Sequence, residues 1–381
     1  MILLEDRKKR IFGLDLLRAI AILLILCSHS VVLLAPNNES SLAFGIKFFG
    51  TLGVDVFFVL SGFLIGGILL NHIILKQTNF KSILYFWIRR WFRTLPNYYL
   101  ILVINILLLF LFNRQRNFEI WSYFLFLQNF SSSQPDFFTE SWSLSIEEFA
   151  YILLPLLLIL CLIIKLKITT RTFLWLSVLC IAIVTINRMY FNAFLVESSM
   201  EWSGSLRKVV VYRLDSIYYG FLGAFVFKCY KSIWENFKYT FAFLGITIFF
   251  SSHVYIYWFN LVPDVESTFF NMCYLPLVSI SIILFFPLVY SLELKGVIKR
   301  IITKVSLWSY SLYLVNFSIL LLSLDYFFQI EDFSIAQKSL LLIGFWLISF
   351  FLAFLLYTFY EIPMMSLRDS NFFKKRFSAK N

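Results

Sequence analysis

Long apolar runs recur along the whole sequence, and each is about as long as a helix that spans the hydrocarbon core of a membrane, roughly twenty residues. Of the 381 residues, 60% are hydrophobic and 14% are charged. No polar stretch between the runs is long enough to fold as a separate soluble domain. We therefore expect an all-α fold, a polytopic transmembrane helical bundle that forms one domain over residues 1–381.

About ten membrane-spanning helices are predicted from these runs. Their expected positions are 14–34, 44–70, 97–112, 143–164, 172–187, 213–229, 239–258, 270–292, 305–323 and 339–360. The first run follows a basic segment, as the apolar part of a signal peptide would. It is too long for such a peptide, however, and no small-residue cleavage site follows it, so we expect a retained helix.

The basic residues are unevenly distributed between the two sides of this predicted bundle. With the N-terminus placed in the cytoplasm, 24 of the 33 Lys and Arg residues lie in cytoplasmic segments and six lie in outer ones. Lys and Arg concentrate in the cytoplasmic loops of membrane proteins, so both termini are predicted to be cytoplasmic. A membrane, and not nucleic acid, therefore explains the net charge of +11.

The five cysteines are scattered through the apolar runs. No two of them have the Cys-x-x-Cys spacing that is typical of metal ligands and redox pairs. Neither a metal site nor a disulfide framework is predicted.

The first apolar run, LDLLRAIAILLILCSHS, carries two ionisable side chains, Arg18 and His29. A charged side chain at the centre of a membrane helix costs roughly 2.5–3.5 kcal/mol, so intramembrane charges point to a function. Eleven residues correspond to about three helical turns, which places both side chains on one face, roughly 16 Å apart. The structural alternatives are an Arg18 that extends to the membrane surface and a His29 that is packed and hydrogen-bonded.

A second basic motif, FWIRRWFRTLP, precedes the third predicted span and contains Arg89, Arg90 and Arg93. Arg90 and Arg93 are three residues apart and share a helix face. Guanidinium groups bind phosphates in bidentate geometry, so an anion site is one interpretation. The alternative is a positive anchor among interfacial aromatic residues. By the predicted topology, the motif lies on the same side of the membrane as Arg18.

The motif ESWSLSIEEFAYILLPL opens the fourth span from the outer side. Ser145 and Glu148 have the spacing of a capping box, which would give Glu148 a structural role. Ser143 and Glu147 are four residues apart and share a face. Glu147 is predicted at the depth of His29, where a carboxylate could orient one imidazole nitrogen and leave the other free as a base. The alternative is a Glu147 at the level of the lipid headgroups.

Other polar or small residues stand out in two further spans. Asp55 is predicted near the outer end of the second span, and Gly62 and Gly66 form a Gly-x-x-x-Gly face that favours close helix packing. Arg213 and Asp215 open the sixth span but are two residues apart, so they need separate partners. Their structural interpretation is neutralisation by residues of other helices.

Together these residues predict two polar groups separated by part of a bilayer. A cationic entrance on one side consists of Arg18, Arg90 and Arg93. A histidine–carboxylate group near the other side consists of His29, Glu147 and Asp55. This arrangement suits a long anionic molecule whose reactive end reaches a base. Buried charges also line transport pathways, so a transporter or flippase for a polysaccharide precursor is the alternative function.

Seven stretches of the sequence resemble the membrane acyltransferase 3 family, which is typified by O-antigen and exopolysaccharide O-acetyltransferases of bacterial inner membranes. They are GLDLLRAIAILLILCSHS, GVDVFFVLSGFLI, FWIRRWFRTLPNYYL, SWSLSIEEFAYILLPLLL, RLDSIYYGFLGA, SYSLYLVN and YEIP. They extend from Gly13 to Pro363, so the resemblance covers the core of the predicted domain and leaves short basic tails on either side.

The resemblance implies a reaction and a set of site residues. The family's Arg-x₁₀-His, Arg-x-x-Arg and Ser-x-x-x-Glu motifs fall here on Arg18 and His29, Arg90 and Arg93, and Ser143 and Glu147. The implied reaction moves an acyl group, acetyl foremost, from cytoplasmic acyl-coenzyme A to a hydroxyl group. The implied acceptor is a saccharide or lipid-linked saccharide at the outer face of the inner membrane.

On that basis we expect the three arginines to hold the phosphates of the donor. We expect His29 to act as general base, with Glu147 and Ser143 orienting it. Acetyl-coenzyme A is the expected donor substrate, and neither a permanently bound cofactor nor a nucleic-acid partner is expected. The family's SYxxYLxH stretch ends here in Asn316, for which a structural role is expected. Lipopolysaccharide, capsule, peptidoglycan and small secreted molecules all stay open as acceptors.

Overall fold

The structure, a computed structural model, describes residues 10–34, 41–112, 118–191, 198–263, 266–328 and 330–368. Within these ranges the chain is helical and contains no β-strand. Among the described residues, nine helices are long and apolar enough to cross a membrane, or ten if two segments bent by 94° form one span. The prediction of an all-α polytopic bundle of about ten helices is therefore confirmed.

The elements follow the predicted spans closely in number and order. The elements that form these nine spans, some together with adjoining short elements, are α2 (Phe12–Leu34), α3 (Ser41–Ile74), α4 (Phe80–Leu111), α6 (Ser141–Ile163), α7 (Thr170–Phe191), α12 (Lys238–Trp258), α13 (Leu275–Tyr290), α14 (Val297–Val315) and α16 (Ile335–Leu356). The bent pair consists of α8 (Ser199–Trp202) with η1 (Ser203–Arg207), and α9 (Val210–Arg213) with α10 (Asp215–Cys229). The shorter elements are α5 (Trp121–Phe124), α11 (Lys231–Asn236), η2 (Phe269–Tyr274), η3 (Asn316–Leu321), α15 (Leu322–Phe327), η4 (Ile330–Asp332), η5 (Tyr357–Glu361) and α17 (Ile362–Arg368).

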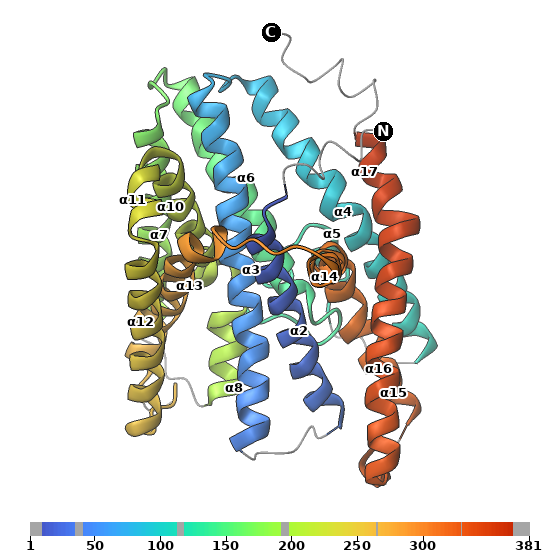
Figure 1. Ribbon diagram of the computed structural model, residues 1–381. Helices are drawn as coiled ribbons and strands as arrows, with labels where there is room; N and C mark the ends of the chain where they lie inside the picture. The colour runs from blue at the N-terminus through green and yellow to red at the C-terminus, as the bar shows by residue number, and fades with distance from the viewer. Residues whose placement is uncertain are drawn as a thin grey trace.

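Helices α2 and α3 lie at the centre of the bundle. α12 and α13 lie on one side of them and α16 on the opposite side (Figure 1). α2 packs against α3 and α14, α3 packs against α10, and α4 contacts both α6 and α14. The helices that carry the charged motifs therefore surround a common interior.

Helix α4 begins earlier than the sequence predicts. It starts at Phe80 and not at residue 97, because the Asn79 side chain accepts a hydrogen bond from the backbone N–H of Ser82 at 2.8 Å and caps the helix. Pro96 lies inside the helix and does not end it. Arg90 and its basic neighbours are therefore on a helix wall and not in a preceding connection.

Helix α6 also begins earlier than predicted, at Ser141. The predicted capping box of Ser145 and Glu148 is wrong because both residues lie inside the helix. Ser145 accepts a hydrogen bond from the Gln128 amide at 2.7 Å, and Glu148 accepts one from the Thr94 hydroxyl at 2.8 Å. The segment before α6 is thus folded against the helix, which has no free end at Ser145.

The close packing predicted for the two glycines of α3 is confirmed. A Cβ atom added to Gly62 would lie 1.9 Å from the carbonyl oxygen of Ile217. One added to Gly66 would lie 3.1 Å from the Cα atom of Phe221. α3 and α10 therefore contact each other backbone to backbone.

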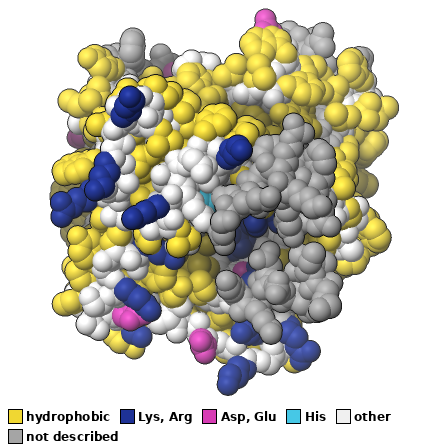
Figure 2. All heavy atoms as spheres, turned by 90° about the horizontal axis from the view of Figure 1, so that it is seen from above, with side chains coloured by type: hydrophobic (Ala, Val, Ile, Leu, Met, Phe, Trp, Pro, Cys, Tyr) yellow, Lys and Arg dark blue, Asp and Glu magenta, His cyan; other side chains and the backbone are white. Residues whose placement is uncertain are grey.

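Figure 2 looks onto the end of the bundle at which α3 ends and α4 begins. Lys and Arg side chains are frequent on this face, while Asp and Glu side chains are few (Figure 2). The face carries connections that the charge count assigns to the cytoplasm. Along the helices, large apolar side chains such as Leu107, Phe243 and Leu347 are exposed, as expected for residues that face lipid.

Candidate active site

A cavity of about 280 Å³ lies between α2, α3, α4, α6 and α14. Its lining includes Arg18, Arg90, Arg93, Ser143, Glu147 and Tyr313. The apolar part of the wall comes mainly from α3, which contributes Phe57 and Leu64. Motifs from separate parts of the sequence therefore meet around one space.

Arg18 reaches the cavity from α2 and is held there by polar contacts. Its guanidinium donates to the Ser306 hydroxyl at 3.4 Å and lies 3.8 Å from the Asp15 carboxylate. Asp15 is buried, forms an ion pair with Arg10, and accepts a hydrogen bond from Ser306 at 2.8 Å. Arg18 is thus fixed inside the bundle, and the alternative in which it extends to the membrane surface is not the arrangement observed.

The carboxylate of Glu147 pairs with Arg90 and not with His29. Arg90 lies 3.1 Å from this carboxylate, and the hydroxyls of Ser61 and Tyr151 donate to it at 3.0 and 2.8 Å. The prediction that Glu147 orients His29 is therefore wrong. The carboxylate turns toward the guanidinium on the adjacent helix α4, because a charged donor forms the stronger hydrogen bond.

Ser143 contacts Tyr313 of α14 and not Glu147. The hydroxyls of Ser143 and Tyr313 are 2.7 Å apart, and both residues line the cavity. Both hydroxyls also lie within hydrogen-bond distance of the backbone carbonyl of Glu140, Tyr313 at 3.0 Å and Ser143 at 3.4 Å, so either hydroxyl can donate to the other. The expected support of Glu147 by Ser143 is wrong, because the Ser143 hydroxyl pairs with Tyr313 while the Glu147 carboxylate accepts from Ser61, Arg90 and Tyr151.

His29 is half-buried and is oriented by the residues that follow α14. Its Nδ1 atom is hydrogen-bonded to the side-chain oxygen of Asn316, and its ring meets the Phe317 ring edge to face at 4.7 Å. The Asn316 amide nitrogen donates to the carbonyls of Leu312 and Tyr313 at 2.5 and 3.0 Å, so the amide oxygen faces His29 as an acceptor. Nδ1 therefore carries the proton, and Nε2 keeps its free lone pair.

Arg18 and His29 share one face of α2, as their spacing predicts. Arg18 contacts Ser306, and His29 contacts Asn316, on the same neighbouring chain segment. Tyr313 lines the cavity, whereas Asn316 follows it by about one helical turn, roughly 4.5 Å along the axis. His29 thus lies about one turn beyond the end of the cavity that is opposite Arg18.

Several polar residues around the cavity are not predicted by the sequence analysis. Asp15 could have been found, because it precedes Arg18 by three residues and shares its face. Tyr151 could likewise have been found from its position four residues after Glu147. Glu140 offered no such signal, because its partner lies on another helix.

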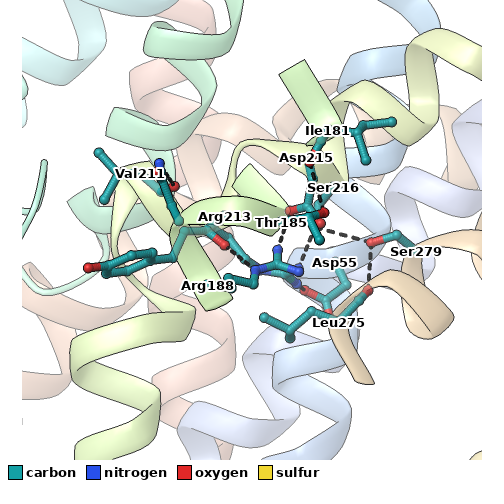
Figure 3. A network of polar contacts seen from close by, with 12 residues as sticks. Asp55, Ile181, Thr185, Arg188, Val211, Arg213, Asp215, Ser216, Leu275 and Ser279 are labelled. Atoms are coloured by element: carbon teal, nitrogen blue, oxygen red, sulfur yellow. Dashed lines mark hydrogen bonds and ion pairs between the residues drawn. The ribbon is translucent and has the colours of Figure 1, made fainter. Parts of the chain in front are cut away.

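Asp55, Arg213 and Asp215 form a separate buried network (Figure 3). Arg213 pairs with Asp55 of α3, and Arg188 of α7 pairs with Asp215. The prediction that Arg213 and Asp215 need separate partners on other helices is confirmed. The prediction that Asp55 joins His29 is wrong, because the fully buried guanidinium of Arg213 requires the carboxylate as its counter-charge.

A multi-pass helical bundle that surrounds an arginine-lined cavity defines an integral membrane protein. The family model described as an acyltransferase domain matches residues 11–360, so the chain belongs to this acyltransferase family. The resemblance to the membrane acyltransferase 3 family is therefore confirmed over nearly the whole chain.

Two curated proteins are similar to parts of the chain. One, named "Putative peptidoglycan O-acetyltransferase YrhL", comes from Bacillus subtilis and is 34% identical over 192 residues, which cover 45% of this chain and 27% of that protein. The other, peptidoglycan O-acetyltransferase OatA of Listeria monocytogenes, is 30% identical over 168 residues, which cover 40% of this chain and 25% of that protein. Each match thus spans about a quarter of the relative's length. No solved structure matches the chain significantly.

Proposed function

We propose that the chain transfers an acetyl group from cytoplasmic acetyl-coenzyme A to a hydroxyl of a cell-surface saccharide, or of its lipid-linked precursor, at the outer face of the cytoplasmic membrane. Membership of an acyltransferase family favours acyl transfer over polysaccharide transport. Because both relatives are named for peptidoglycan, a peptidoglycan-type glycan is the first acceptor to test.

The observation that carries this proposal is the cavity that joins three arginines to a hydroxyl-lined end near His29. Coenzyme A combines phosphate groups with a narrow pantetheine arm that ends in the thioester. The guanidinium groups of Arg18, Arg90 and Arg93 suit the phosphates. With the phosphates held there, the arm extends along the cavity and presents the thioester toward His29.

His29 acts as the general base in this proposal. Its Nε2 atom takes the proton of the acceptor hydroxyl while that oxygen attacks the thioester carbonyl. The new C–O bond forms, the C–S bond breaks, and coenzyme A leaves as a thiol that receives the proton from His29. Asn316 holds the other proton on Nδ1, so that Nε2 is free again for the next acceptor.

Glu147 and Ser143 are positioning residues in this proposal. Glu147, with Tyr151, holds the Arg90 guanidinium at the cavity wall. The hydrogen bond between the hydroxyls of Ser143 and Tyr313 orients this pair at the end of the cavity nearest His29.

The test is acetyl transfer by the purified protein in proteoliposomes, with labelled acetyl-coenzyme A and soluble peptidoglycan fragments. The His29→Ala variant is expected to lose transfer by roughly 10²- to 10⁴-fold, the range typical of a general base. His253→Ala is the matched control, since His253 lies on α12 and does not line the cavity. Undiminished transfer by His29→Ala would remove the basis for the proposed mechanism.

The same vesicles separate the enzyme from the alternative transporter. An acyltransferase modifies the saccharide only when the acetyl donor is supplied. Movement of unmodified saccharide across the vesicle membrane without a donor, together with the absence of acetylated product, would favour the transporter instead.

A further inference from the structure

A π-helical turn, η3, interrupts the helix that faces His29. It covers Asn316–Leu321 and follows α14 directly. A π-turn inserts an extra residue into a helix and redirects the side chains around it, and such turns are frequent at functional sites. The first two residues of η3, Asn316 and Phe317, both contact His29. The third, Ser318, points to a different partner.

That partner is Glu140, which immediately precedes α6. Glu140 is 3% exposed. Its Oε1 atom accepts two hydrogen bonds from Ser318, one from the hydroxyl at 2.6 Å and one from the backbone N–H at 3.4 Å. Its Oε2 atom is buried and has no hydrogen-bond partner among the described residues. Three consecutive residues of one turn therefore connect His29 to a buried carboxyl group.

The surroundings of Glu140 favour its neutral form. The titratable groups that interact with its charge are Tyr98 on α4 and Tyr313 on α14; His29 on α2 contacts the same π-turn through Asn316. Arg207 lies 5.0 Å above the ring of Trp142, two residues along the chain from Glu140, and within the described residues Glu140 forms no salt bridge with Arg207 or any other cation.

Burial raises the pKa of the Glu140 carboxyl to about 8, although the hydrogen bonds from Ser318 act in the opposite direction. Oε1 accepts both bonds from Ser318, which leaves Oε2 as the oxygen that can carry a proton. A pKa of about 8 favours the carboxylic acid over the carboxylate at neutral pH.

We propose that Glu140 is a positioning residue of the acyl-transfer site that holds the π-turn through Ser318 and thereby keeps Asn316 and Phe317 in place against His29. This inference rests on the proposed function of His29. A carboxylate formed at this buried position would have no counter-charge among the described residues and would have to regain water. The turn, and with it His29, would then lose its fixed position.

The sign of the expected pH dependence follows from this. Glu140 is protonated, and the site is ordered, below about pH 8; the acid ionises and activity falls as the pH rises through that value. Glu140→Gln keeps a neutral side chain with an oxygen acceptor for Ser318, so this variant is expected to retain activity below pH 7 and to lose the alkaline fall. Glu140→Ala removes the acceptor and is expected to lower kcat on the order of 10- to 100-fold, with KM for acetyl-coenzyme A unchanged.

The experiment compares kcat as a function of pH for the full-length wild type, Glu140→Gln, Glu140→Ala and the control Glu119→Gln, which changes an exposed acid of the same loop. Glu119→Gln is expected to follow the wild-type profile. The proposal is overturned if Glu140→Ala keeps the wild-type kcat, if Glu140→Gln loses as much activity as Glu140→Ala, or if the wild type and Glu140→Gln have the same alkaline fall.

A second readout does not depend on acetyl transfer and so separates this proposal from the proposed function. Nitrogen NMR of the His29 ring, in a background in which His72 and His253 are replaced, reports which ring nitrogen carries the proton. A single Nδ1–H tautomer is expected for the wild type and Glu140→Gln, and a mixture for Glu140→Ala. An unchanged spectrum for Glu140→Ala would refute the positioning role even in a protein that shows no transferase activity.

Discussion

Arg93 differs from Arg18 and Arg90, the two other arginines that line the cavity, in having no carboxylate partner among the described residues. Arg18 and Arg90 are each close to a carboxylate, Asp15 and Glu147 respectively. Arg93 is exposed at the cavity wall and forms no salt bridge with a described residue. Its guanidinium is therefore the one of the three with most of its hydrogen-bonding capacity left for a ligand.

We expect Arg93→Ala to raise KM for acetyl-coenzyme A by roughly 10- to 100-fold, because a hydrogen bond to a charged group contributes about 1.5–3 kcal/mol. kcat is expected to change little, since the proposed mechanism places Arg93 at the phosphates of the donor and not at the reacting atoms. Steady-state kinetics with varied donor concentration measure both constants.

The control is Arg89→Ala, which removes an arginine from the same helix. Arg89 lies near the ring of Tyr85 and does not line the cavity. An equal increase in KM for Arg89→Ala would mean that net positive charge, and not a specific phosphate contact, explains donor binding.

At the residue scale, the sequence predicts relations within one helix better than relations between helices. The shared face of Arg18 and His29 follows from helical periodicity alone. The partner of Glu147 does not, because it depends on how α6 packs against α4, which brings Arg90 closer than His29. Glu140 could not be found for the same reason, since Ser318 is redirected by a π-turn that helical periodicity does not reveal.

At the scale of elements, the close contact between α3 and α10 depends on glycines, which have no side chain to separate the two backbones. Gly62 on α3 faces the backbone of Ile217, and Gly220 on α10 faces the carbonyl oxygen of Val59, where an added Cβ atom would lie at 2.2 Å. An added Cβ atom would therefore clash, because the backbone atoms of Ile217 and Val59 cannot rotate away from it as a side chain can.

Gly62→Ala is therefore expected to lower the free energy of unfolding by about 1–3 kcal/mol, the usual cost of overpacking. Thermal unfolding of the detergent-solubilised protein measures the effect. The matched control is Gly67→Ala on the same helix, because an added Cβ atom there meets nothing within 4 Å. Equal stability of the two variants would contradict the account of close backbone packing.

The positions of the spans were predictable because hydropathy and length define them. The starts were less predictable where a helix extends beyond its most apolar part. The first half of α4 carries polar and basic residues, and only the cap formed by Asn79 reveals that the helix already begins at Phe80. The bend between η1 and α9 was likewise not predicted, because a short polar break does not indicate an angle.

For the whole molecule, the charge asymmetry predicts an orientation that labelling can test. In a background without the five native cysteines, Lys299→Cys and Glu119→Cys place single thiols at exposed positions in predicted cytoplasmic and outer segments. In intact spheroplasts, a membrane-impermeant maleimide is expected to label only Glu119→Cys. Lysis is expected to make Lys299→Cys reactive as well. The reverse pattern would invert the proposed topology and place the arginine side of the cavity outside.

The network of Asp55, Arg188, Arg213 and Asp215 also has a consequence for the synthesis of the protein. Asp55 and Arg188 precede their partners in the chain, so α3 and α7 have left the ribosome before α9 and α10 are made. Arg213 and Asp215 then enter a membrane in which both counter-charges are already present. Because of this order along the chain, the segment that carries Arg213 and Asp215 does not enter the lipid without counter-charges.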